Sequence, residues 1–192
     1  MREIPWDGGR WSNKPVAAVQ EGSDLVVTAE EGSDAWRLTS YGFVRDSEHA
    51  LLVPFSQNCA MEVEFTAGFT EQFDQAGIFV YASPEKWVKT GLELSDGVLC
   101  AGAVVTDVFS DWSLSPVPKW RDQVVTLRVS REGNALTIRA RPAGGPLQLL
   151  RVIPMGPEVE LEAGPFVCAP SRAGLKVRFH SWRLGEADTS LH

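Results

Sequence analysis

Hydrophobic and polar residues alternate with a period of two along most of the chain, and no long segment has the spacing of an amphipathic helix. In residues 59–69, Met61, Val63 and Phe65 alternate with charged or polar residues. The same alternation returns in three later segments, at 124–130, 134–141 and 174–182. Side chains alternate across a β-strand, so each segment is predicted to be a strand with one apolar face.

Turn-forming residues separate these strands, for example Asp96-Gly97 and Glu132-Gly133-Asn134. A spacing of roughly 10–20 residues between turns is typical of two packed antiparallel sheets. We therefore predict an all-β sandwich. The residues expected in its core are Met61, Val63, Phe65, Ile78, Val80, Leu92, Leu127, Val129, Ile138, Val177 and Phe179.

The length of 192 residues suits one domain with a sizeable core. No internal repeat, low-complexity tract or Pro-rich linker divides the chain, so we expect a single domain over residues 1–185. Residues 186–192 are small, polar and unpatterned. They are predicted to form a loose C-terminal tail.

The composition is that of an ordinary globular protein, with 44% hydrophobic and 22% charged residues. No apolar run approaches the ~20 residues that cross a bilayer. No apolar signal segment follows the N-terminal Met-Arg-Glu-Ile-Pro-Trp, so we expect a cytoplasmic protein that does not bind membranes. The three cysteines, Cys59, Cys100 and Cys168, are expected to be small buried thiols.

Charge and motif spacing exclude several other classes of function. The net charge of −7 disfavours nucleic acid as a partner. His49, His180 and His192 are too scattered to predict a metal site. The glycine pairs lack the features of a phosphate-binding loop, and no cofactor is predicted.

The segment from Lys86 to Leu94 carries the candidate chemistry. An extended strand there places Trp87, Lys89 and Glu93 on one face and apolar side chains on the other. A sugar site needs an apolar plate for the ring and charged or amide groups for the hydroxyls, and this face offers both. Four further candidates lie near predicted strands: Asp111, Trp112, His49 and Gln75.

Two other interpretations of these residues stay open. Lys89 and Glu93 could form an ordinary surface ion pair while the tryptophans fill the core. A glycosidase would need two carboxylates, and the pairs available are Glu62 with Glu64 or Glu93 with Asp111. Glu62 and Glu64 are better interpreted as outward carboxylates of a solvated strand.

Several short motifs, taken together and in order, resemble one family, the regulation-of-enolase-protein family. They span about residues 6–182. Two departures from the family pattern are Ala35 and Phe73, in place of a bulky aromatic residue and a tyrosine. The motifs are Asp34–Thr39, Asp74–Gly77, Trp87–Glu93, Val104–Thr106, Ser110–Ser113 and Cys168–Pro170, before a closing strand near Phe179.

This resemblance implies a concanavalin A-like lectin/glucanase domain, a jelly-roll sandwich with one concave sheet, and no proven reaction. We therefore predict a binding module that recognises a carbohydrate or sugar-like metabolite on its concave face. The second hypothesis is a regulatory partner of a metabolic enzyme such as enolase. An enzyme acting on glycosides through Glu93 and Asp111 is the third, and a binding protein is favoured over an enzyme.

Overall fold

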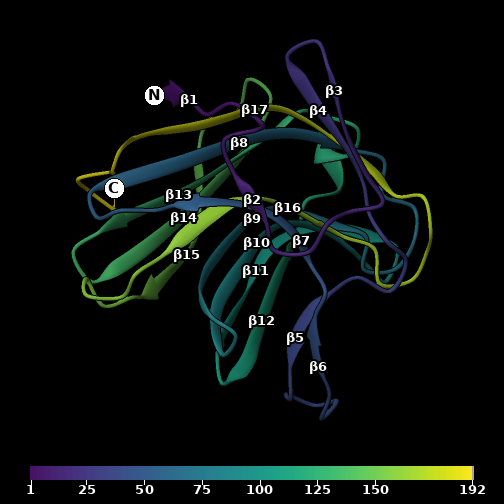
Figure 1. The fold of residues 1–192 in the computed structure, drawn as a ribbon, viewed down its shortest axis with the longest axis horizontal. Helices are drawn as coiled ribbons and strands as arrows, with labels where there is room; N and C mark the ends of the chain where they lie inside the picture. Colours follow the sequence, from purple (N-terminus) through teal and green to yellow (C-terminus); the bar gives the residue numbers. More distant parts are fainter. Residues whose placement is uncertain (192) are drawn as a thin grey trace.

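Two antiparallel sheets pack face to face in the computed structural model, which describes residues 1–191 (Figure 1). This confirms the all-β sandwich expected from the alternating pattern. His192 lies outside the described residues. Within residues 1–191, η1 at Pro118–Trp120 is a single 3₁₀ turn, and no helix is long and apolar enough to span a membrane.

One sheet has eight strands, in the order β15-β14-β13-β8-β17-β4-β3, with β1 paired to β17. Its strands are β1 Arg2–Glu3, β3 Ala17–Glu21, β4 Asp24–Thr28, β8 Cys59–Ala67, β13 Val125–Glu132, β14 Ala135–Pro142, β15 Gln148–Pro154 and β17 Lys176–Glu186.

The other sheet has seven strands, in the order β12-β11-β10-β9-β16-β7-β2. Its strands are β2 Arg10–Trp11, β7 His49–Pro54, β9 Gln75–Ser83, β10 Lys86–Ser95, β11 Val98–Asp107, β12 Phe109–Pro116 and β16 Glu162–Cys168. A separate hairpin of β5 Ala35–Arg37 and β6 Val44–Asp46 projects from the sandwich near β12 (Figure 1).

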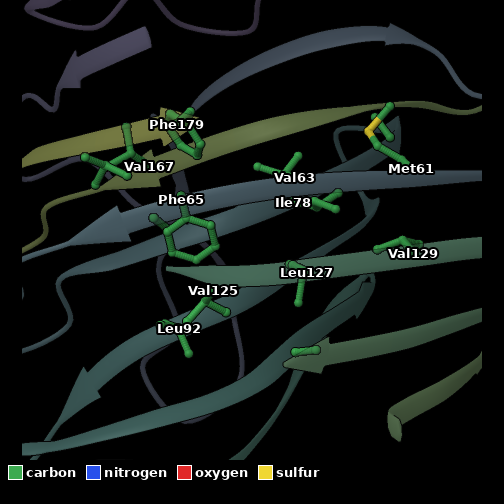
Figure 2. Packing of buried hydrophobic residues seen from close by; sticks show 14 of the residues in the cluster. Met61, Val63, Phe65, Ile78, Leu92, Val125, Leu127, Val129, Val167 and Phe179 are labelled. Atoms are coloured by element: carbon green, nitrogen blue, oxygen red, sulfur yellow. The ribbon is translucent and has the colours of Figure 1, made fainter. Parts of the chain in front are cut away.

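The core lies between the two sheets, and Figure 2 shows side chains of both sheets meeting there. All eleven residues predicted for the core are buried. Phe65 of β8 and Phe179 of β17 pack with their ring centroids 5.9 Å apart, opposite Ile78 and Leu92 of the seven-stranded sheet. The prediction succeeds because each alternating strand buries the side chains of one parity.

The hairpin of β10 and β11 determines which of their side chains lie on the outer face of the seven-stranded sheet. Asp96 and Gly97 have φ of 50° and 76°, and two successive positive φ values are typical of a type I′ turn. The resulting register pairs Lys89 with Val104 and Glu93 with Cys100. Lys89 and Glu93 thus point away from the core, as predicted.

A row of glycines crosses the sheet between Lys89 and Glu93. Gly91 of β10 pairs with Gly77 of β9 and with Gly102 of β11. A Cβ atom added to Gly91 would lie 2.0 Å from the carbonyl oxygen of Ala76, so only glycine permits this approach of the strands. The row leaves the outer face between Lys89 and Glu93 without a side chain.

The outer face of the eight-stranded sheet is covered by ion pairs, and these reach the C-terminal residues. The guanidinium of Arg128 donates to Glu62 at 3.0 Å and to Asp188 at 2.7 Å. Arg139 also donates to Asp188, and the N–H of Ala187 donates to the carbonyl of Asn58. Asp188, in the segment 186–192 predicted to be a loose tail, is thus bound by arginines of β13 and β14.

Candidate functional site

A cavity of about 320 Å³ opens on the outer face of the seven-stranded sheet, beside the β5–β6 hairpin. Its floor is formed by the sheet residues Gln75, Lys89, Glu93 and Val104. The remaining lining comes from segments around the floor. The aromatic residues of this lining, called the aromatic walls below, are Trp36, Tyr41, Phe43, Phe73 and Trp112.

Lys89 forms a buried ion pair in the floor with Asp34, not with Glu93 as one sequence interpretation proposed. Lys89 is 4% exposed, and its Nζ donates to Oδ1 of Asp34 at 2.7 Å. Burial works against the charged form of Lys89, but Asp34 and the nearby Glu93 outweigh it and raise the pKa of the ammonium above its ordinary value. Lys89 is therefore a fixed cation neutralised by a fixed anion.

Glu93 is the unpaired group of the floor. Its residue is 8% exposed, and no group within residues 1–191 forms a hydrogen bond or an ion pair with its carboxyl. Burial raises its pKa to about 7; Lys89 lowers the value and Asp34 raises it. The carboxyl can therefore donate or accept a hydrogen bond near neutral pH.

A second buried carboxyl, Glu48, lies just before β7 and outside the cavity lining. Burial raises its pKa to about 7, while Lys89 lowers the value. The buried thiol of Cys168 has its pKa raised for the same reason. The region around Lys89 thus holds more carboxyl groups than cations.

The aromatic walls meet at steep angles. The ring of Trp36 stands at 90° to that of Trp112, with centroids 6.2 Å apart, and Phe73 meets Trp112 at 70° and 6.3 Å. Tyr41 stacks on Phe43 at 5.3 Å. Trp112 and Tyr41 remain 40% and 61% exposed, so a ligand can reach both rings.

Polar contacts hold the walls in place around the floor. The backbone N–H of Arg37 donates to Oγ of Ser110, and its guanidinium pairs with Glu85 at 3.0 Å. These contacts tie the β5–β6 hairpin to the sheet. On the other side, the buried carboxylate of Asp74 accepts from Arg172 at 2.7 Å and from the N–H of Thr70, so it ties the loop that carries Phe73 to the loop of Arg172.

Four of the seven predicted site residues line the cavity, namely Gln75, Lys89, Glu93 and Trp112. Trp87 lies outside it and stacks on Phe79 with centroids 5.4 Å apart. His49 is also outside and buried; its Nε2 accepts from the N–H of Glu30, and its Nδ1 lies 3.1 Å from the carbonyl of Asn13. Burial lowers the pKa of His49.

Asp111 is the third predicted residue outside the cavity. Its side chain lies on the opposite face of the sheet from that of Glu93. Val104 pairs with Lys89 and with Trp112, so the neighbouring Asp111 belongs to the other side-chain parity. Its carboxylate pairs with Arg151 at 3.1 Å across the edge of the sandwich. Glu93 and Asp111 therefore cannot flank one glycosidic bond. The hypothesis of an enzyme that acts on glycosides through these two carboxylates is not supported by their positions.

The other carboxylate pair weighed from the sequence, Glu62 and Glu64, is occupied by arginines. Glu62 binds Arg128, and Glu64 pairs with Arg183 at 2.9 Å. This agrees with their interpretation as outward carboxylates of a strand. Within residues 1–191, no group of three or more His, Cys, Asp or Glu side chains is placed to hold a metal ion.

The sequence interpretation missed most of the residues contributed by the hairpin region: Asp34, Trp36, Tyr41, Phe43 and Arg45. Asp34 and Trp36 belong to a motif that carried the family resemblance, but nothing in their spacing connected them with Lys89. A usable signal was the density of aromatic residues around Gly42, in a short segment that shows no core-facing alternation.

Comparison with solved structures supports the fold. A crystal structure of a functionally unknown protein from Saccharomyces cerevisiae has a TM-score of 0.90 and 34% identity, covering 96% of this chain and 100% of that one. A xylan beta-1,4-xylosidase from Bacillus halodurans C-125 has a TM-score of 0.73 and 15% identity, covering 97% of this chain and 39% of the xylosidase. The second likeness concerns the fold alone.

Comparison of sequences gives the family. The chain is 36% identical to "Regulation of enolase protein 1" of Saccharomyces cerevisiae over 176 residues, which is 92% of this chain and 88% of that protein. Residues 11–187 match the model of a family described as "Protein of unknown function (DUF1349)". The resemblance drawn from the short motifs is thereby confirmed, and the chain belongs to this family.

Proposed function

We propose that the protein is a cytoplasmic binding module whose cavity recognises a carbohydrate or sugar-like metabolite. The observation that carries this proposal is the combination of buried polar groups and accessible aromatic rings in one cavity. Lys89, Gln75 and Glu93 lie in its floor, and Trp112 and Tyr41 are exposed in its walls. An indole face covers the C–H surface of a sugar ring, while the floor groups bind hydroxyls.

The size of the cavity favours a small ligand. Its volume of about 320 Å³ lies at the lower end of the range of about 300–1,000 Å³ typical of ligand pockets. The β5–β6 hairpin closes one side, so the cavity is a pocket rather than a groove that runs the length of the sheet. A monosaccharide or a sugar-like metabolite fits these limits better than a long polysaccharide.

Calorimetric titration with a panel of monosaccharides tests the proposal on wild type and two aromatic variants. Trp112→Ala removes an exposed wall and should weaken binding at least about fivefold, since stacking of this kind contributes about 1–3 kcal/mol. Phe109→Ala is the matched control, because Phe109 is also exposed on β12 but does not line the cavity. Equal losses in both variants, or no binding by wild type, would contradict a sugar site.

A role as regulatory partner of a metabolic enzyme is the second candidate. It is supported by the name of the relative "Regulation of enolase protein 1" and by the exposed rings of Tyr41, Phe43 and Trp112. Exposed aromatic clusters are enriched at protein interfaces. Titration with purified enolase separates the candidates: a loss of complex in Tyr41→Ala with no response to sugars favours the partner role.

The cytoplasmic location rests on the state of the thiols. Cys59, Cys100 and Cys168 are all free, and thiols persist in reducing compartments. Cell fractionation followed by labelling of the thiols after denaturation tests the location. Recovery of the protein from an oxidising compartment would contradict it.

A further inference from the structure

We propose that the ligand carries a protonated amine, which binds the carboxylate of Glu93 inside the aromatic walls. This inference rests on the proposed function, because it names the class of sugar-like ligand that the same cavity takes. The class is an amino sugar or a similarly small amine with an apolar face. Neutral sugars and sugar acids would then bind more weakly.

The floor of the cavity carries one carboxyl whose charge is not balanced by a neighbouring cation. Lys89 and Asp34 lie 2.7 Å apart and neutralise each other. Glu93 is also buried, yet no hydrogen bond within residues 1–191 reaches its carboxyl. An unpaired buried carboxylate is costly, and a cation from the ligand is the partner that removes this cost.

The walls of the cavity add a second feature that suits a cation. The rings of Trp36 and Trp112 are perpendicular, and Phe73 meets Trp112 at 70°, so the lining presents aromatic faces in more than one direction. Ring faces attract cations, most strongly when water is excluded. One cation already uses this surface, because the guanidinium carbon of Arg45 lies 5.1 Å from the centroid of Phe43.

The cations near Glu93 do not cancel the preference of the cavity for a protonated amine. The charge of Lys89 is balanced by Asp34 at contact distance. Arg45 lies at the exposed rim, where water and salt screen its charge. A neutral ligand would satisfy the aromatic rings but would leave the ionised form of Glu93 without a counter-ion.

Binding of an amine also requires a change in the protonation of Glu93. The titratable groups that act on or near it are Lys89 on the same strand, Asp34 beside the hairpin and the neutral thiol of Cys100 on β11. With a pKa of about 7, about half of the Glu93 carboxyls are protonated at neutral pH. An arriving ammonium favours the carboxylate, so the carboxyl releases its proton to the solvent.

Calorimetric titrations at pH 7 with glucosamine, glucose and N-acetylglucosamine test the choice of ligand. These three sugars differ at one position, which carries an amine, a hydroxyl or an uncharged amide. Wild type should bind glucosamine at least about tenfold more tightly than the other two, and Glu93→Gln should remove this advantage. Glu62→Gln, on the outer face of the other sheet, is the matched control and should retain it.

Tetramethylammonium serves as a second probe, because it has no proton of its own to lose. Its affinity for wild type should rise about fivefold or more from pH 6 to pH 8, as the ionised fraction of Glu93 grows from about one tenth to about nine tenths. Glu93→Gln should show no such rise. Tyr41→Leu, at an exposed wall position, should weaken binding at both pH values without affecting folding.

The outcomes separate this inference from the sugar proposal. Equal affinities for glucosamine and glucose, or an amine preference that survives in Glu93→Gln, would overturn the amine inference and leave a sugar site standing. Binding of tetramethylammonium without binding of any sugar would support the amine inference and overturn the sugar proposal. Absence of binding by all four probes would overturn both.

Discussion

The outer faces of the two sheets use carboxylates of low solvent exposure in opposite ways. On the eight-stranded sheet, the side chain of Glu62 is 12% exposed and binds Arg128 at 3.0 Å, with Arg183 at 3.4 Å. On the seven-stranded sheet, Glu93 is 8% exposed and has no partner within residues 1–191. Burial alone therefore does not mark a site, and the missing partner is the informative difference.

The same contrast applies to the surroundings of the two faces. The arginines on the eight-stranded sheet are bridged by acidic residues and hold the chain end through Asp188. Around Glu93, the neighbours are aromatic rings and one ion pair that is already balanced. The carboxylates of one face are paired with arginines, whereas the carboxyl of Glu93 on the other face has no partner within residues 1–191.

The largest effect is expected from breaking the ion pair in the floor. Asp34→Asn leaves the buried ammonium of Lys89 without its carboxylate, which should lower the free energy of unfolding by about 3–5 kcal/mol. Urea denaturation measures the loss. In Asp34→Asn combined with Lys89→Met, at least about 1 kcal/mol should be recovered, because the unpaired charge is gone. A loss below about 1 kcal/mol in the single variant would show that the pair is not structural.

The next prediction concerns the substitution of Glu by Gln on each of the two faces, at Glu93 and at Glu62. The pKa of Glu93 is about 7 when folded, against an ordinary value of 4.5, so the folded state holds its proton more tightly. Stability is then lost as the pH rises from 4.5 to about 7, by about 3 kcal/mol from this group. Glu93→Gln should reduce this loss, leaving the contribution of Glu48, which has the same sign.

Glu62→Gln should act in the opposite direction at pH 8. It removes the ion pairs to Arg128 and Arg183, so the free energy of unfolding should fall by about 1–2 kcal/mol. Thermal unfolding of both variants at pH 5 and pH 8 provides the measurement. Changes of equal sign in the two variants at pH 8 would remove the contrast between the faces.

An effect of similar size is expected from filling the glycine row. The Cβ atom of Gly91→Ala would meet the carbonyl oxygen of Ala76 at 2.0 Å, so the strands must separate. We expect a loss of about 1–3 kcal/mol, as for other overpacked sites. Chemical denaturation together with the sugar titration would show whether stability and binding fall together. Unchanged stability would show that the close approach of these strands is not required.

The smallest effect is expected at Asp111. Its side chain is 68% exposed in the pair with Arg151, and exposed pairs contribute little. Asp111→Asn should change the free energy of unfolding by less than about 0.5 kcal/mol and leave ligand affinity unaltered. A tenfold loss of affinity would show that Asp111 takes part in ligand binding, in spite of its position on the other face.

The sandwich and its core could be predicted from the sequence because alternation reports directly which side chains share a face. The same rule placed Lys89 and Glu93 together on the outer face. It could not supply Asp34, because this contact depends on how a separate hairpin packs on the sheet. Asp111 was grouped with Glu93 because it follows the next predicted strand. The register of β11 and β12 instead places the two side chains on opposite faces of the sheet.

The construction of the β5–β6 hairpin has a consequence for how this family can diversify. Its two strands pair only with each other among the described strands, and its rings face the cavity rather than the core between the sheets. Residues 36–45 therefore contribute to the walls of the cavity and not to the core between the sheets. Substitutions in this segment are expected to change the walls of the cavity while leaving the core between the sheets intact, so the cavity can vary at little cost to the fold.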